Sequence, residues 1–237
     1  PKELLATDRD ERIRNISLHN LATSSAEIKQ IRVSLREGRL WELIEQKAKS
    51  HPALFKAFNY VLKNSEKSYW ELLTPLTKQV GLKIFDEFSY YRPEFTKARR
   101  RIIENFTPHS DQILLLLTSG KKNPIELLYA NENIRKTIKQ ELREYDIGIF
   151  LPFIGILPIE LIETFPFSQY VFSNIVSRNL IEMVNKDVQE FIKEMKYERV
   201  MLTYIDSEEE FKQQMDPIEN SLRKVAKEFQ FVNIKDL

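Results

Sequence analysis

Short apolar runs alternate with amphipathic segments in the second half of the chain. Three of these runs have the length of buried strands, and they cover residues 113–117, 147–151 and 200–205. Apolar residues at helical spacing predict helices around 131–145 and over 177–195, with a last helix within 208–229. Strands that alternate with helices predict a three-layer α/β module with a mostly parallel sheet.

The first 64 residues show helical patterning instead. Asp8 with Glu11, and Ser24 with Glu27, have the spacing of capping boxes, which predicts a series of short helices. Gly38 is typical of a helix end. The pattern therefore predicts mixed α and α/β architecture, in which an N-terminal helical segment is followed by the α/β module.

A connecting segment of different character lies between these two parts. Residues 83–85 predict a short strand, and Pro93 suits the first turn of a basic helix that runs to about Asn105. Pro108 marks the next boundary. We therefore divide the chain into a helical part (1–64), a helical linker (65–108) and the α/β module (109–237).

Composition narrows the class of protein. With 42% hydrophobic and 30% charged residues in a chain of 237, the protein is globular. The longest apolar stretch, 147–161, is broken by glycines and prolines, so we expect no membrane span and, with no signal-like start, a cytoplasmic location. Because the net charge is only +1, contact with nucleic acid must come from local patches.

Two basic groups are candidates for such patches. Arg99, Arg100 and Arg101 lie on the predicted basic helix, and Lys121 and Lys122 follow the first apolar run. Either group could contact RNA phosphates. The alternative for the arginines is a solvated helix face that pairs with nearby glutamates. The lysines do not form a phosphate-binding loop, because the Gly-x-x-x-x-Gly-Lys-Ser/Thr pattern is absent.

A proline-rich segment over residues 150–170 is a third candidate. Its prolines fix the backbone and favour a preformed surface. Gln169 and Tyr170 at its end could hydrogen-bond to a base or stack on it. The alternative is a loop that only packs on the sheet.

The chain has no recognisable catalytic or complete metal site. Cysteine is absent, no serine lies near a His–Asp pair, and the three histidines lack metal-ligand spacing. We therefore predict no catalytic residue. Read alone, His19 is a capping or packing residue.

Three segments resemble archaeal tRNA-guanine transglycosylases. Residues 16–51 contain Ile-Ser-Leu-His-Asn-Leu and Leu-Arg-Glu-Gly-Arg-Leu-Trp-Glu-Leu-Ile-Glu, residues 90–95 contain Arg-Pro-Glu, and residues 152–161 read Pro-Phe-Ile-Gly-Ile-Leu-Pro-Ile-Glu-Leu. The first run is similar to the end of the family's catalytic domain. The resemblance implies that His19 is the last ligand of a structural zinc, whose three cysteines come from a preceding segment or a partner chain.

The resemblance also implies a function. Family members exchange guanine 15 in the D-arm of tRNA for preQ0, during archaeosine biosynthesis, using an aspartate on a catalytic barrel. The present chain corresponds to the part of the enzyme after the zinc cysteines, without the RNA-binding PUA domain, and serves structure and tRNA placement. The implied partners are a barrel-containing catalytic chain, tRNA and, in the assembled enzyme, a second copy.

Two alternatives remain open. The first is an archaeosine-synthase-like protein that acts on preQ0 already in tRNA. That family carries Pro-Cys where Thr118 and Ser119 stand here, and its downstream Ser and His are absent from this chain. The second alternative is a non-catalytic tRNA-binding scaffold.

Overall fold

The structure is a computed structural model of the whole chain. It describes residues 8–65, 67–72, 74, 81–130, 132, 135–136, 144–173, 176–205 and 209–232. The chain divides into two compact units, Pro1–Lys63 and Asn64–Leu237. The second unit holds residues 65–108 together with the α/β module.

The described residues of the first unit form three helices. They are α2 (Arg9–Arg36), α3 (Leu40–Ala48) and α4 (Pro52–Asn64). Asp8 is the N-cap of α2, and its side chain accepts a hydrogen bond from the backbone N–H of Asp10. Gly38, at a φ of 66°, follows the end of α2, as predicted.

The predicted helix start at Ser24 is wrong. Residues 9–36 form one helix of 28 residues. No glycine or proline interrupts this stretch, and a serine inside a helix costs only a fraction of a kcal/mol, roughly 0.5 relative to alanine. A capping-box pattern alone therefore does not break the helix.

Polar and aromatic contacts join the helices of the first unit. Lys47 on α3 pairs with Glu27 on α2 at 2.7 Å. Trp41 donates to Glu45 through its indole N–H at 3.0 Å, and its ring centroid lies 6.1 Å from that of Phe58 on α4. No residue of α2 is buried.

The second unit is built on a five-stranded sheet with the order β4-β3-β2-β6-β7. The strands are β2 (Gln112–Leu117), β3 (Asp146–Leu151), β4 (Gly155–Pro158), β6 (Arg199–Tyr204) and β7 (Glu228–Phe231). All neighbours are parallel except β3 and β4. The predicted helical segment followed by an α/β region with a mostly parallel sheet is confirmed.

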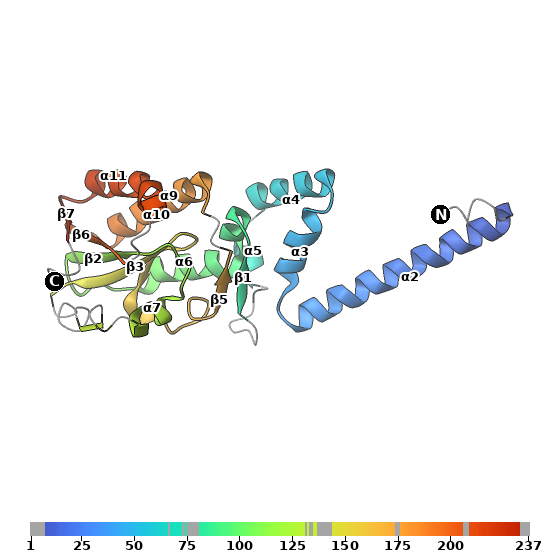
Figure 1. Cartoon of the computed structure of the whole chain (residues 1–237), viewed down its shortest axis with the longest axis horizontal. Helices are drawn as coiled ribbons and strands as arrows, with labels where there is room; N and C mark the ends of the chain where they lie inside the picture. The colour runs from blue at the N-terminus through green and yellow to red at the C-terminus, as the bar shows by residue number, and fades with distance from the viewer. Residues whose placement is uncertain are drawn as a thin grey trace. The chain divides into compact units, whose positions relative to one another are not determined.

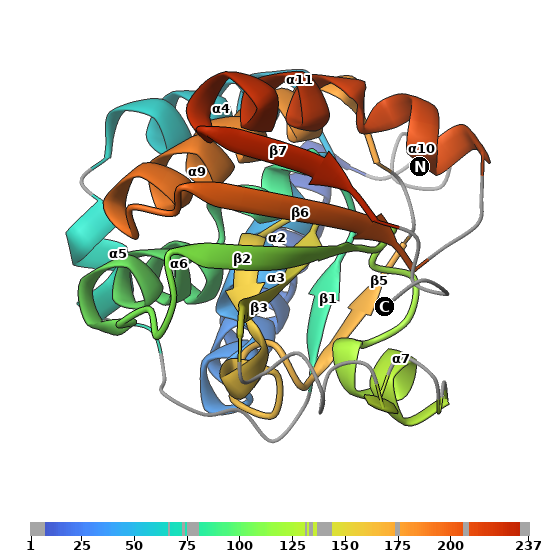
Figure 2. The ribbon, with the colours of Figure 1, turned by 90° about the vertical axis from the view of Figure 1, so that its left-hand side faces the viewer.

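Helices flank this sheet. They are α6 (Pro93–Asn105), α7 (Pro124–Ala130), α9 (Arg178–Glu194), α10 (Glu209–Gln214) and α11 (Asp216–Val225). In Figure 1, α9, α10 and α11 lie on one side of the strands and α7 on the other. Figure 2 shows β2, β6 and β7 side by side. Helix α6 spans the residues predicted for the basic helix.

A second, two-stranded sheet pairs β1 (Leu82–Ile84) with β5 (Tyr170–Phe172) in parallel. Short helical elements accompany it, namely α5 (Lys67–Leu72), η1 (Glu87–Tyr91) and η2 (Ile159–Leu161). The predicted strand at 83–85 is confirmed with a shift of one residue. The aromatic ring of Phe153 joins the two sheets, since its centroid lies 4.9 Å from that of Tyr170 and 5.2 Å from that of Phe172.

Other expectations need correction. Most of the helix predicted around 131–145 lies outside the described residues, whereas α7 was not predicted. The segment 208–229 contains two helices instead of one, because Pro217 starts a second helix at α11. Phe229, at its end, lies in β7. Among the described residues, no helix combines the length and apolar character of a membrane span.

A buried carboxylate ties the amino ends of three strands together. Asp146, the first residue of β3, accepts from the backbone N–H of His109 at 3.1 Å and of Ser110 at 3.4 Å, just before β2. It also accepts from the hydroxyl of Tyr197, just before β6, at 2.7 Å. Burial first, and then the hydrogen bond to Asp146, raise the pKa of Tyr197, which therefore stays protonated as the donor.

Candidate nucleic-acid interface

The loop that follows β2 is held in one conformation. The hydroxyl of Thr118 accepts from the backbone N–H of Gly120 at 3.2 Å. Gly120 has a φ of 77°, and a Cβ at this position would lie 3.1 Å from Cδ of Pro152. Both the backbone angle and the close approach favour glycine. The backbone that leads into Lys121 and Lys122 is therefore fixed in one conformation.

Two hydrogen bonds fasten the same loop beside β5. The side-chain amide of Asn123 donates to the carbonyl of Ser168 at 2.7 Å, and the hydroxyl of Tyr170 donates to the carbonyl of Lys122 at 3.3 Å. The exposed residues Lys121 and Lys122 thus lie near the exposed Gln169. The structure brings these three predicted residues into one region.

Tyr170 itself is turned inward. Its side chain is buried, and its ring meets Phe153 edge-on. Its hydroxyl positions the lysine loop. In this structure Tyr170 therefore orients neighbouring groups and does not present its ring at the surface.

Arg99 on α6 also faces inward. Its guanidinium donates to the carbonyls of Phe153 at 3.0 Å and of Tyr90 at 2.8 Å, and Nε lies 3.3 Å from Asp187. The guanidinium carbon is 3.9 Å from the centre of the Tyr90 ring. These contacts place Arg99 inside the unit, where it joins α6 to α9.

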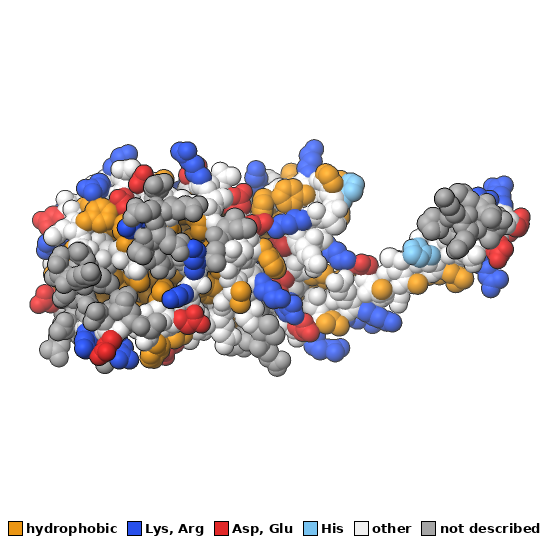
Figure 3. Space-filling model, in the orientation of Figure 1, with side chains coloured by type: hydrophobic (Ala, Val, Ile, Leu, Met, Phe, Trp, Pro, Cys, Tyr) orange, Lys and Arg blue, Asp and Glu red, His pale blue; other side chains and the backbone are white. Residues whose placement is uncertain are grey.

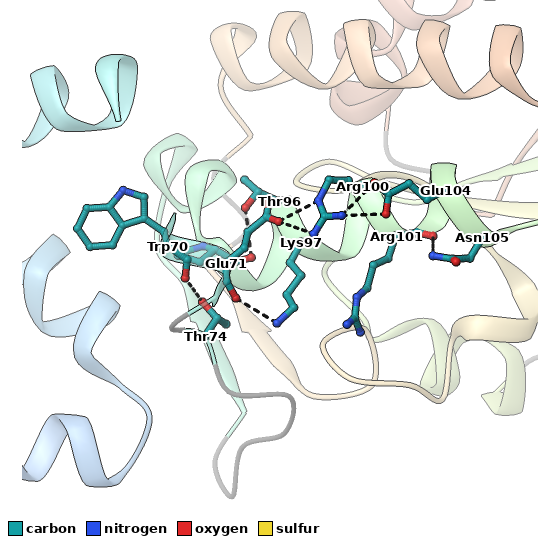
Figure 4. A network of polar contacts seen from close by, with 10 residues as sticks. Trp70, Glu71, Thr74, Thr96, Lys97, Arg100, Arg101, Glu104 and Asn105 are labelled. Carbon is teal, nitrogen blue, oxygen red and sulfur yellow. Dashed lines mark hydrogen bonds and ion pairs between the residues drawn. The ribbon is translucent and has the colours of Figure 1, made fainter. Parts of the chain in front are cut away.

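Arg100 belongs to a surface network with two glutamates (Figure 4). It lies 2.8 Å from the carboxylate of Glu71 on α5 and 2.8 Å from that of Glu104. The hydrogen bond with Glu104 has the largest effect and that with Glu71 the next, and both raise the pKa of Arg100. Lys97 donates to the carbonyl of Glu71 at 3.1 Å. The network fastens α5 to α6.

Arg101 is exposed and points away from this network (Figure 4). The three consecutive arginines therefore have three different surroundings. Arg99 is held inside the unit and Arg100 pairs with Glu71 and Glu104, so a phosphate track made by all three has no support in the geometry.

His19 lies on the exposed surface of α2. A closed zinc site needs four ligands, and the described residues contain no group of three or more His, Cys, Asp or Glu that could hold a metal ion. An exposed imidazole on a helix can serve as one ligand. Zinc at this position would require the other ligands from outside the described residues.

The buried carboxylates of the second unit have structural partners. Glu94 lies 3.2 Å from the guanidinium of Arg92, a fully buried side chain that also donates to the carbonyl of Lys83 at 2.8 Å. Glu71 and Asp146 are engaged as described above. A general acid or base must reach its substrate, and these groups face protein instead.

Asn123 is a positioning residue that the sequence analysis missed. Besides its bond to Ser168, its carbonyl oxygen accepts from the backbone N–H of Ile125 at 3.0 Å, at the start of α7. The signal was present in the Asn-Pro dipeptide at 123–124, which favours the start of a turn or helix. The contact with Ser168, 45 residues away, had no local signal.

The fold and site define a class: an α/β module that carries a rigid basic loop beside a small second sheet. Comparison with known proteins then places the chain. A family model described as a domain of unknown function (DUF5591) matches residues 95–234. The chain belongs to this family.

Relatives with assigned names are archaeal tRNA-guanine(15) transglycosylases. That of Saccharolobus solfataricus is 31% identical over 204 residues, covering 85% of this chain and 40% of the relative. That of Sulfolobus acidocaldarius is 30% identical, covering 85% of this chain and 38% of the relative. That of Korarchaeum cryptofilum is 37% identical over 102 residues, covering 43% of this chain and 17% of the relative. The resemblance inferred from the sequence is confirmed.

The chain spans about two fifths of the first of these relatives. Among solved structures, the crystal structure of AF0587, a protein of unknown function, matches 56% of this chain and 42% of that one, with a TM-score of 0.38 and 16% sequence identity. A likeness at that level carries no argument for fold or function.

Proposed function

We propose that this chain is the C-terminal part of an archaeal tRNA-guanine(15) transglycosylase, which exchanges guanine for preQ0 in the tRNA D-arm. The observation that carries the proposal is the alignment of 204 residues with relatives of that name, of which the chain spans 40%. On this proposal the work takes place on tRNA in the cytoplasm, as part of archaeosine biosynthesis.

The chain's own role is to place tRNA and support the enzyme. Lys121 and Lys122 would contact phosphates from their fixed loop, with Gln169 beside them. The buried carboxylates, which are tied to structural partners, do not offer the nucleophile that base exchange needs. A barrel on another polypeptide segment supplies it, so the chain alone is catalytically inert.

Helix α2 is the proposed contact with the barrel-bearing polypeptide. Apolar side chains lie at its surface (Figure 3), and those more than two fifths exposed include Ile13, Ile16, Leu18, Leu21, Ile28, Ile31, Val33 and Leu35. Exposed apolar patches of this kind mark interfaces. A helix of 28 residues without a buried residue gains most of its stability from such a partner.

Zinc is part of the same proposal. His19, exposed on α2, would join three cysteine thiolates from a preceding segment or partner chain in a closed structural site. The metal would couple its binding energy to assembly. We expect metal analysis to find zinc in the assembled enzyme and none in the isolated chain, and His19→Ala to weaken assembly. An active assembly without zinc would remove the metal from the proposal.

The alternatives have less support. In an archaeosine-synthase-like protein a cysteine would stand where Thr118 and Ser119 stand here. Both side chains are buried, and their hydroxyls accept from backbone N–H groups of their own loop, at 3.2 Å for Thr118 and 3.5 Å for Ser119. They therefore shape the loop. A non-catalytic tRNA scaffold remains the second candidate, because the lysine loop fits that role equally well.

Reconstitution tests the proposal. The chain is mixed with the barrel-bearing partner found by co-purification, and incorporation of labelled guanine or preQ0 into a tRNA transcript is measured. A transcript with adenine at position 15 is the control. We expect exchange with the mixture and none with either the chain alone or the control transcript. Exchange by the chain alone, or none by the complex, would contradict the proposed division of roles.

A further inference from the structure

The small sheet of β1 and β5 has one buried face and one exposed face. Register places Leu82 beside Tyr170 and Ile84 beside Phe172, and all four are buried. Successive side chains of a strand point to opposite faces. The other face of the two strands therefore carries Lys83 and Val171, and the residues that flank the strands, Phe85, Gln169 and Ser173, are exposed as well. We call this set the outer face.

The outer face combines an aromatic ring with polar groups. Phe85 is 41% exposed and Val171 is 69% exposed, although both are large apolar residues. Lys83 is the register partner of Val171, and Gln169 lies one position before β5. The set contains no carboxylate. Asp86, the next residue after Phe85, directs its carboxylate to the backbone N–H of Phe88 at 3.0 Å.

This face is held rigidly. The buried Arg92 donates to the carbonyl of Lys83 at 2.8 Å, and the hydroxyl of Ser89 accepts from the backbone N–H of Phe85 at 3.2 Å. Ser173 donates through its backbone N–H to the carbonyl of Ile84 at 3.0 Å. The ring of Phe85 is therefore carried on a fixed backbone, which reduces the entropy lost when a ligand binds.

We propose that the outer face binds an unstacked nucleotide of RNA, with its base on the ring of Phe85 and a phosphate near Lys83. This inference rests on the proposed function, which supplies tRNA as the ligand. Exposed aromatic rings on sheet faces stack unpaired bases, and a side-chain amide such as that of Gln169 can donate to and accept from a base edge. Base exchange also requires a nucleotide taken out of its stack.

The adjacent loop extends the positive charge. Asn123 and Tyr170 bind the loop of Lys121 and Lys122 next to the start of β5, through the carbonyls of Ser168 and Lys122. In Figure 2, β1 and β5 lie next to each other, apart from the strands of the larger sheet. Lys83 within the outer face and the loop lysines beside β5 are the positive side chains that would contact the phosphates of a bound strand.

The test measures binding of a tRNA transcript to the 237-residue chain by fluorescence anisotropy at several salt concentrations. Loss of one base–aromatic stack weakens binding by roughly 5- to 150-fold. We expect this loss in Phe85→Ala and also in Phe85→Leu, because leucine keeps apolar bulk and lacks the ring. Neither change should alter the salt slope, whereas Lys83→Gln should lower it by about 0.7.

Phe231→Ala is the matched control, since Phe231 is 42% exposed on the other sheet. Circular dichroism checks that each variant is folded. Wild-type affinity in Phe85→Ala would overturn the outer-face site and leave the proposed function standing. Wild-type affinity in Phe85→Leu would show that the aromatic ring is not needed and would assign the face to apolar protein contact. Equal losses of affinity in Phe85→Ala and Phe231→Ala would show that the effect is not specific to the outer face. Absence of tRNA binding by the wild type would overturn both this site and the RNA role of the chain.

Discussion

Removal of the Asp146 carboxylate should destabilise the second unit strongly. The side chain is buried and accepts from the backbone N–H groups of His109 and Ser110 and from the hydroxyl of Tyr197. A hydrogen bond to a charged group contributes about 1.5–3 kcal/mol, and an unsatisfied buried donor costs about 1–3 kcal/mol. The contact with the imidazole of His109, at 3.4 Å to a mostly exposed ring, adds little.

These terms are not additive, so we expect Asp146→Ala to lower the free energy of unfolding by about 3–5 kcal/mol. For a unit of this size, that corresponds to roughly 6–20 °C in the melting temperature. Tyr197→Phe removes one donor and should cost only about 1–2 kcal/mol. Urea unfolding followed by circular dichroism measures both. If Asp146→Ala costs less than about 1 kcal/mol, the idea that this carboxylate ties three strands together is wrong.

The same contact predicts a pH dependence. The pKa of Tyr197 is raised by burial and then by its bond to Asp146. Because the folded pKa is above the unfolded value of about 10, the stabilising contribution is complete below that pH and is lost as pH rises above it. Tyr197→Phe lacks this titrating group. The difference in free energy of unfolding between wild type and variant should therefore shrink as the pH rises from about 9 to about 11, the range around the ordinary pKa of tyrosine. A difference that stays constant would contradict the assignment.

Three further changes test other parts of the structure. Gly120→Ala should destabilise the unit by about 1–3 kcal/mol in urea unfolding, because alanine at positive φ is strained and its Cβ meets Pro152. Glu71→Gln should weaken the α5–α6 contact and increase proteolytic cleavage near α5, an effect that high salt should mimic in the wild type. Replacing Lys121 and Lys122 by glutamine should lower the salt slope of tRNA binding by about 0.7 per lost phosphate contact, without changing discrimination among bases.

The central strands were predictable because their signal is local. Residues 113–117 and 200–205 are continuous apolar runs, as strands buried on both faces require. Strand β5 has only three residues, and its partner β1 lies 88 positions earlier, so its pairing had no local signal. The long helix α2 was divided wrongly because a capping-box pattern at Ser24 was weighed without the tendency of the flanking residues to continue a helix.

The sequence indicated which residues are candidates for the site, but it could not indicate which of them lie close together in space. Lys121, Lys122 and Gln169 meet because tertiary hydrogen bonds bring two loops together, although neither loop contains that information alone. Three consecutive arginines were treated as one group. Consecutive helical residues lie about 100° apart around the axis, so residues 99, 100 and 101 cannot share one face.

The two ends of the parallel strands have different tasks. At the amino ends, the carboxylate of Asp146 fixes β2, β3 and β6 relative to one another. At the carboxyl ends, β2 leads into the lysine loop and β3 leads to Phe153, whose ring supports β5. Loops at the carboxyl ends of parallel strands are where α/β folds bind their ligands. A rigid amino end keeps these loops, and the small sheet that packs on Phe153, in fixed positions, as the proposed RNA contacts require. The small sheet is thus an extension of the carboxyl end, to which the ring of Phe153 joins it through its contacts with Tyr170 and Phe172.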